Sequence, residues 1–142
     1  MLNAKKIILV EDDPGLIDIY REIFQRTSFD VEIAKTGTEM LQESVHIKNG
    51  VSMKPDLILL DLMKPGAEGV KILETFKTDP QLKNIPIFVL TNYENPDMEK
   101  TLKRNLIWPE RYLIKANHTP FELIGIIKTY LGSETEKKTR LA

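Results

Sequence analysis

The sequence predicts an α/β fold: a doubly wound, five-stranded parallel sheet with helices on both of its faces. Two observations lead to this prediction. Five short runs rich in Ile, Leu and Val recur along the chain, and segments with apolar residues at helical spacing separate them. Such an alternation is typical of parallel sheets, because right-handed crossover helices join successive strands and cover both faces.

The first half of the chain supplies two strand–helix units. A β-branched run over residues 7–10 ends in three acidic residues, and Pro14 follows at a position suited to the first turn of a helix. Apolar residues at helical spacing continue that helix to Phe24. The stretch "DVEIAKTG" alternates like a half-buried strand that stops at Gly37, and a second helix is expected over residues 38–48.

The second half of the chain continues the pattern with three strands and three helices. The runs "DLILLD" and "IPIFVLT" lack polar alternation, as expected of strands covered on both faces, and "RYLIK" is the fifth strand. Helices are expected over residues 69–77, 96–106 and 120–131, with Asn95 capping the second of them.

Length favours a single domain. A chain of 142 residues is long enough for one hydrophobic core, and the five strand–helix units are complete at residue 131. We therefore assign residues 1–131 to one domain. The charged segment 132–142 holds few apolar residues, so we expect a disordered tail there.

Composition excludes several classes of function. The net charge is −1 and neither half carries a basic block, so nothing supports a nucleic-acid-binding surface. No apolar run approaches the roughly 18–20 residues of a membrane span, and no signal-peptide pattern opens the sequence. Cysteine is absent, which removes disulfides and thiol chemistry. We expect a cytoplasmic protein that binds neither nucleic acid nor membrane.

Polar side chains follow the expected strands at their carboxyl ends. Glu11 and Asp12 follow the first strand, Asp61 closes the third, Thr91 the fourth and Lys115 the fifth. In an open parallel sheet these ends meet at one edge. Crowded carboxylates call for a cation, and hard oxygen ligands suit Mg²⁺. An ammonium and a hydroxyl can receive phosphoryl oxygens, so the pattern predicts phosphoryl transfer onto an aspartate.

These motifs resemble those of the receiver domains of bacterial two-component response regulators over about residues 4–131. "ILVEDDP" is similar to the acidic motif of the family's first strand, and "DLILLDLMKPGAEG" is similar to its phosphoacceptor segment. The resemblance implies the flavodoxin-like strand order 2-1-3-4-5. It also implies a stand-alone phosphorelay module that receives its phosphoryl group from a sensor histidine kinase or a phosphotransfer protein.

The resemblance assigns roles to the acidic residues. Asp61 becomes the phosphoacceptor, and Asp12, Asp61 and the backbone carbonyl of Met63 become direct ligands of Mg²⁺. Glu11 would bind the ion largely through a water molecule. Asp13 falls outside this set, and we expect it at the N-terminus of the first helix, where negative charge is favourable.

The resemblance also implies a switch. Lys115 matches the lysine that pairs with the phosphate, Thr91 the switch threonine and Tyr112 the switch aromatic, although Tyr112 could equally be a packing residue. An unknown downstream protein would read the face formed by residues 96–131, and the chain would be a monomer or a phosphorylation-dependent dimer. The family's path for attacking water passes the positions of Met63 and Tyr93. Both residues are bulky and neither carries a carboxamide or acid group to orient water, which predicts slow self-dephosphorylation.

Two departures from the family pattern lie on either side of the fifth strand. The family usually follows its lysine with a cis proline, whereas Ala116 follows Lys115 here. A cis bond before a residue other than proline costs about 2.5–4 kcal/mol, so we predict a trans bond. The stretch "RNLIWPERY" replaces the small-residue turn that usually precedes the fifth strand. These changes alter the surface and leave the acidic pocket intact.

Two alternative functions stay open at this point. Aspartate-nucleophile phosphohydrolases usually carry a second Asp two residues after the nucleophile, where this chain has Met63. A degenerate receiver-like interaction domain would have no use for the acidic residues together with Thr91 and Lys115. We therefore expect a phosphoacceptor and no turnover enzyme, with only Mg²⁺-dependent self-phosphorylation and self-dephosphorylation.

Overall fold

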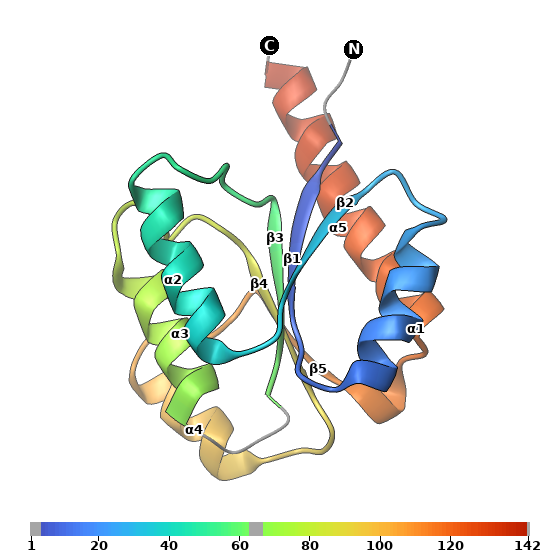
Figure 1. Cartoon of the computed structure of the whole chain (residues 1–142). Helices are drawn as coiled ribbons and strands as arrows, with labels where there is room; N and C mark the ends of the chain where they lie inside the picture. Colours follow the sequence, from blue (N-terminus) through green and yellow to red (C-terminus); the bar gives the residue numbers. More distant parts are fainter. Residues whose placement is uncertain (1–3, 63–66, 142) are drawn as a thin grey trace.

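A computed structural model describes residues 4–62 and 67–141 and confirms the predicted fold (Figure 1). The strands form one parallel sheet in the order β2-β1-β3-β4-β5. Met63 lies outside the described residues, so its predicted role is not tested here. The strands are β1 (Lys6–Val10), β2 (Asp30–Ala34), β3 (Leu57–Asp61), β4 (Ile87–Thr91) and β5 (Arg111–Ile114).

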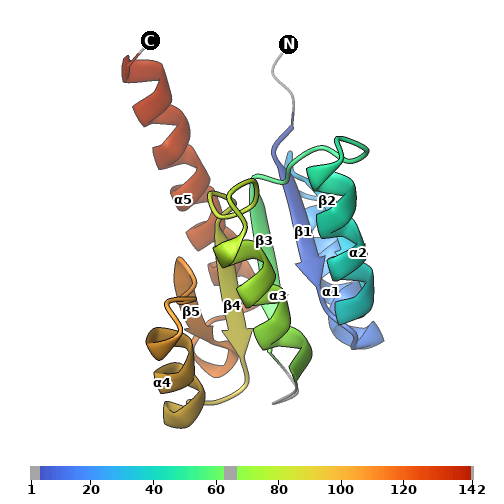
Figure 2. The ribbon, with the colours of Figure 1, turned by 90° about the vertical axis from the view of Figure 1, so that its left-hand side faces the viewer.

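Helices cover both faces of the sheet, as the crossovers predict. In Figure 1, α2, α3 and α4 lie on one side of the sheet and α1 and α5 on the other, and Figure 2 turns the first of these sides to the viewer. Within the described residues, no helix is both long and apolar enough to cross a membrane. The helices are α1 (Pro14–Phe24), α2 (Gly37–Lys48), α3 (Ala67–Thr78), α4 (Pro96–Arg104) and α5 (Pro120–Leu141).

The core consists of two apolar layers, one on each face of the sheet. Alternate residues of the central strands enter opposite layers: Leu60 packs with Phe76 of α3 and its neighbours, whereas Leu59 packs in the cluster that contains Ile127 of α5. All four apolar residues of β3 are buried, as its continuous apolar run predicted. This packing fixes the position of Asp61, the residue that ends the strand.

Side chains cap the helices that begin near the carboxyl edge of the sheet. The Asp13 carboxylate accepts hydrogen bonds from the backbone N–H groups of Gly15 and Leu16, at 2.8 and 3.1 Å. Asn95 accepts from the N–H of Met98 at 3.1 Å. Both caps satisfy N–H groups that a helix start leaves without partners, which confirms the predicted places of Asp13 and Asn95.

Two segments differ from the prediction. Helix α5 continues to Leu141 and so takes up most of the segment for which a disordered tail was predicted; its end projects beyond the sheet in Figure 1. Glu, Lys, Arg and Leu are good helix formers, and extending a helix that packing has already nucleated is easier than starting one. Strand β5 ends at Ile114, and a short 3₁₀ turn over Lys115–Asn117 follows. The Lys115–Ala116 bond is trans, as predicted.

Candidate functional site

The strand register brings the predicted site residues to one edge of the sheet. Val10 pairs with Leu60 in the β1–β3 ladder, so Glu11 and Asp61 are neighbours immediately beyond it. Thr91 pairs with Ile114 in the β4–β5 ladder, so Lys115, the residue after Ile114, lies just beyond Thr91. The sheet therefore delivers two carboxylates, a hydroxyl and an ammonium to one place, as predicted from the carboxyl ends of the strands.

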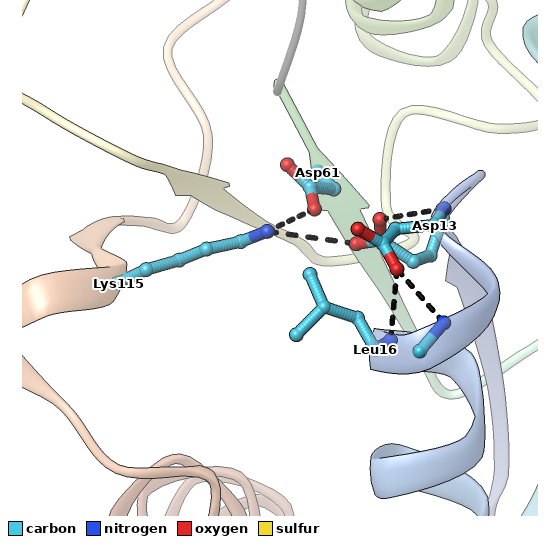
Figure 3. Close-up of polar contacts among 6 residues, drawn as sticks. Asp13, Leu16, Asp61 and Lys115 are labelled. Carbon is cyan, nitrogen blue, oxygen red and sulfur yellow. Dashed lines mark hydrogen bonds and ion pairs between the residues drawn. The ribbon is translucent and has the colours of Figure 1, made fainter.

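Lys115 connects the two carboxylates. Its ammonium donates a hydrogen bond to Oδ2 of Asp61 and lies 3.6 Å from Oε2 of Glu11 (Figure 3). The side chains of Asp61 and Glu11 are 2% and 0% exposed, and that of Lys115 is 15% exposed. Because burying unpaired charge is costly, the ammonium stabilises a pair of carboxylates that would otherwise repel.

The surroundings of Asp61 disfavour its charged form. The pKa of Asp61 is raised to about 8, because burial and the contact with Glu11 raise it by more than Lys115 lowers it. Burial is the largest of these causes. One ammonium therefore does not fully compensate the two buried carboxylates, and the site favours a further positive charge.

The residues at this edge of the sheet provide part of the ligand set that a divalent cation requires. Oε2 of Glu11 and Oδ1 of Asp61 are buried and, within the described part of the chain, accept no hydrogen bond. Both residues line a cavity of about 370 Å³ together with Asp12. Among residues 4–62 and 67–141, however, no three acidic or histidine side chains are grouped closely enough to enclose an ion. The predicted ligands thus share one cavity but do not form a preassembled three-carboxylate cluster.

The predicted switch residues lie in contact. Thr91 is buried, and its hydroxyl lies 3.3 Å from the backbone carbonyl oxygen of Tyr93, to which it donates. Tyr112 is half-buried, and its side chain lies close enough to that of Thr91 to influence its pKa. Burial and the nearby charge of Glu99 raise the pKa of Tyr112, and the Thr91 side chain opposes that shift. Tyr112 therefore lies beside Thr91 and also packs against the apolar layer on that face of the sheet.

Sequence reasoning missed the residues beside Tyr112. The Trp108 ring stacks on the Tyr112 ring, with centroids 5.0 Å apart and planes inclined by 15°. The Lys103 ammonium lies 4.8 Å from the centroid of the Trp108 ring. The sequence offers one sign of this stack, the two aromatic residues in "WPERY". The stretch carries no periodicity that would predict contact between the two rings.

Comparisons with known proteins show which family the chain resembles. A family model described as the response regulator receiver domain matches residues 7–118. The polar-differentiation response regulator DivK of Brucella anthropi is 26% identical over 128 residues, which cover 90% of this chain and 97% of that protein.

Solved structures show the same likeness. The phosphorylated cyanobacterial phytochrome response regulator RcpA superimposes with a TM-score of 0.72 at 30% identity, covering 89% of this chain and 91% of that chain. The Mn²⁺-bound form of the response regulator Rcp1 gives a TM-score of 0.70 at 29% identity, covering 89% of this chain and 94% of that chain. Since the family model covers most of the sequence, the chain belongs to the response-regulator receiver domain family.

Proposed function

We propose that this receiver domain accepts a phosphoryl group on Asp61. The observation that best supports this role is the contact of the Lys115 ammonium with the buried carboxylates of both Asp61 and Glu11. A buried ammonium beside a carboxylate nucleophile is placed to take up the charge that a phosphoryl group brings. The proposed donor is a sensor histidine kinase or a phosphotransfer protein, and the exchange takes place in the cytoplasm.

The transfer is a displacement at phosphorus. A carboxylate oxygen of Asp61 attacks the phosphorus atom, a new O–P bond forms, and the bond from phosphorus to the donor's imidazole nitrogen or acyl oxygen breaks with its electron pair leaving on the donor. Lys115 then exchanges part of its contact with Asp61 for a phosphoryl oxygen. The chain acts only on itself in this scheme, by self-phosphorylation and self-dephosphorylation.

Mg²⁺ is the proposed cofactor. Asp12, Asp61 and the backbone carbonyl of Met63 would hold the ion, with Glu11 reaching it through water. The buried oxygens of Glu11 and Asp61 that accept no hydrogen bond within the described residues support this assignment, as does the Mn²⁺ bound by the similar Rcp1. When bound, the ion neutralises negative charge on the phosphoryl oxygens.

The signal leaves through the face formed by residues 96–131. A phosphoryl group on Asp61 would draw the Thr91 hydroxyl away from the Tyr93 carbonyl, and Tyr112 would respond because its side chain lies beside Thr91. Helix α4 ends in basic residues, which suits a partner with acidic side chains or a second copy of this chain. The reading surface is proposed to include Lys100, Lys103, Arg104 and Tyr112.

Labelling by a small phosphodonor tests the proposal. Incubation with acetyl phosphate and Mg²⁺ is expected to give a stoichiometric, acid-stable and base-labile modification. Asp61→Asn keeps the side-chain shape but removes the nucleophile, so its labelling is expected to vanish. Asp18→Asn is the matched control, because Asp18 is an exposed carboxylate of α1. Equal labelling of the Asp61→Asn variant and the unaltered protein would refute the assignment.

A further inference from the structure

Trp108 lies beside Tyr112, the aromatic residue of the proposed switch. It is the single tryptophan of the chain and precedes β5 in the segment after α4. The Trp108 ring is half-buried, lies nearly parallel to the Tyr112 ring, and packs against the apolar cluster under α4. The Lys103 ammonium, from the last turn of α4, lies over the Trp108 ring at 4.8 Å. Trp108 thus contacts both helix α4 and the switch aromatic.

The Tyr112 side chain has two neighbours. Its ring lies against the Trp108 ring, and its side chain lies close to that of Thr91. Thr91 in turn donates to the Tyr93 carbonyl oxygen at 3.3 Å. If Tyr112 rotated out toward solvent, it would lose the stacking contact with Trp108. Stacked aromatic rings are more favourable than the burial of their area alone.

We propose that Trp108 is a positioning residue that keeps Tyr112 in its inward position against Thr91 and transmits the state of this pair to α4 through Lys103. The inference rests on the proposed phosphorylation of Asp61 and adds a residue that acts through Tyr112. The stack exists only while Tyr112 points inward, so it shifts the population toward this arrangement before any phosphoryl group arrives. A ligand of Asp61 that prefers the inward arrangement then binds more tightly, because a larger fraction of the protein is competent to bind it.

The test measures binding of beryllofluoride, a mimic of the phosphoryl group, in the presence of Mg²⁺. Apparent affinities come from titrations followed by amide NMR shifts, and thermal unfolding of each variant verifies that it is folded. Trp108→Leu removes the stack, whereas Trp108→Phe keeps an aromatic ring at the same place. Phe29→Leu is the matched control, since Phe29 also pairs with an aromatic ring, that of Phe24, and lies outside the stack and outside the 96–131 face.

Trp108→Leu is expected to weaken mimic binding by about twofold to tenfold, the range that the loss of one aromatic pair implies. Trp108→Phe is expected to restore most of the affinity, and Phe29→Leu to leave it unchanged. In a protein that already carries Tyr112→Leu, the exchange Trp108→Leu is expected to have no further effect, because Trp108 acts through Tyr112. In the Trp108→Leu variant, the mimic-induced shifts of the α4 amides are expected to shrink relative to those of the pocket.

Two results would overturn the inference. One is an affinity of the Trp108→Leu variant within about twofold of the unaltered protein, since the loss of an aromatic pair should exceed this. The other is a loss of affinity on Trp108→Leu that is equally large in the unaltered protein and in the Tyr112→Leu variant, which would make Trp108 a purely structural residue. Failure of the unaltered protein to bind beryllofluoride would instead overturn the proposed function of Asp61, and the inference with it.

Discussion

Replacing Asp61 with Asn should change how the folding stability of the metal-free protein depends on pH. The folded protein raises the pKa of Asp61 from the ordinary value of 3.8 to about 8, chiefly because the side chain is buried. The unfolded chain has no such environment and releases the proton near pH 4. Asn resembles the protonated carboxyl group in shape and cannot ionise, so the variant lacks this titration.

The sign of the effect follows from the two pKa values. Between about pH 4 and pH 8 the folded state holds a proton on Asp61 that the unfolded state has lost, so the free energy of unfolding decreases as the pH rises. The contribution of Asp61 is fully present below about pH 4 and is lost as the pH passes about 8. One proton corresponds to about 1.4 kcal/mol per pH unit, or about 2–3 kcal/mol between about pH 5 and pH 7.

Denaturant unfolding at a series of pH values measures this effect. The fluorescence of Trp108, the single tryptophan, provides the probe. The quantity of interest is the stability of the Asp61→Asn variant minus that of the unaltered protein, both in the presence of a chelator. Loss of the contact with Lys115 shifts this difference by a constant amount, whereas the Asp61 titration makes it grow as the pH rises toward 8.

A difference that stays constant from about pH 5 to pH 8 would refute the reasoning, because it would mean that the buried carboxyl group titrates normally. Addition of Mg²⁺ supplies a second comparison. At about pH 8 the ion should stabilise the unaltered protein more than the Asp61→Asn variant, since only the former presents the Asp61 carboxylate.

Three further predictions concern the framework and the lifetime of the phosphoryl group. Glu110→Ala is expected to lower the free energy of unfolding by about 1–3 kcal/mol, because the Glu110 carboxylate pairs with Lys77 and accepts a β4 backbone N–H at 2.6 Å. The control Glu22→Ala, at an exposed ion pair, should change the stability by less than about 0.5 kcal/mol. Equal losses of stability for Glu110→Ala and Glu22→Ala in urea unfolding would contradict this expectation. Asp13→Ala removes the cap of α1 and should cost about 1 kcal/mol; an unchanged unfolding midpoint would speak against the cap. The acyl phosphate is expected to last minutes to hours at neutral pH, since Tyr93 is bulky and has no carboxamide or acid group to orient water. Tyr93→Asn should shorten that lifetime, and decay within seconds in the unaltered protein would disprove this expectation.

Much of the fold and of the site could be predicted from the sequence because the determining signals are local. Continuous apolar runs mark strands covered on both faces, and the residue that ends each run must lie at the edge of a parallel sheet. This reasoning brought Glu11, Asp61, Thr91 and Lys115 together, as the structure confirms. Asp13 was also predictable, because a cap contacts N–H groups only two and three residues away.

Features that depend on three-dimensional packing could not be predicted in this way. The stacking of Trp108 on Tyr112 depends on how the segment after α4 enters β5, which no periodicity encodes. The pairing of Lys77 with Glu110 joins α3 to the segment before β5 across 33 positions of sequence. The continuation of α5 past Leu131 was missed because a low apolar content argues against packing but does not argue against a helix.

Mapping the modified residue tests the central claim most directly. After reaction with acetyl phosphate and Mg²⁺, borohydride reduces an aspartyl phosphate to homoserine, and mass spectrometry of the digested protein locates the altered residue. The account predicts homoserine at position 61 alone, with the signal lost when Mg²⁺ is chelated. Homoserine at another acidic residue, such as Asp12, or an unaltered Asp61 in a protein that carries stoichiometric phosphate, would contradict it.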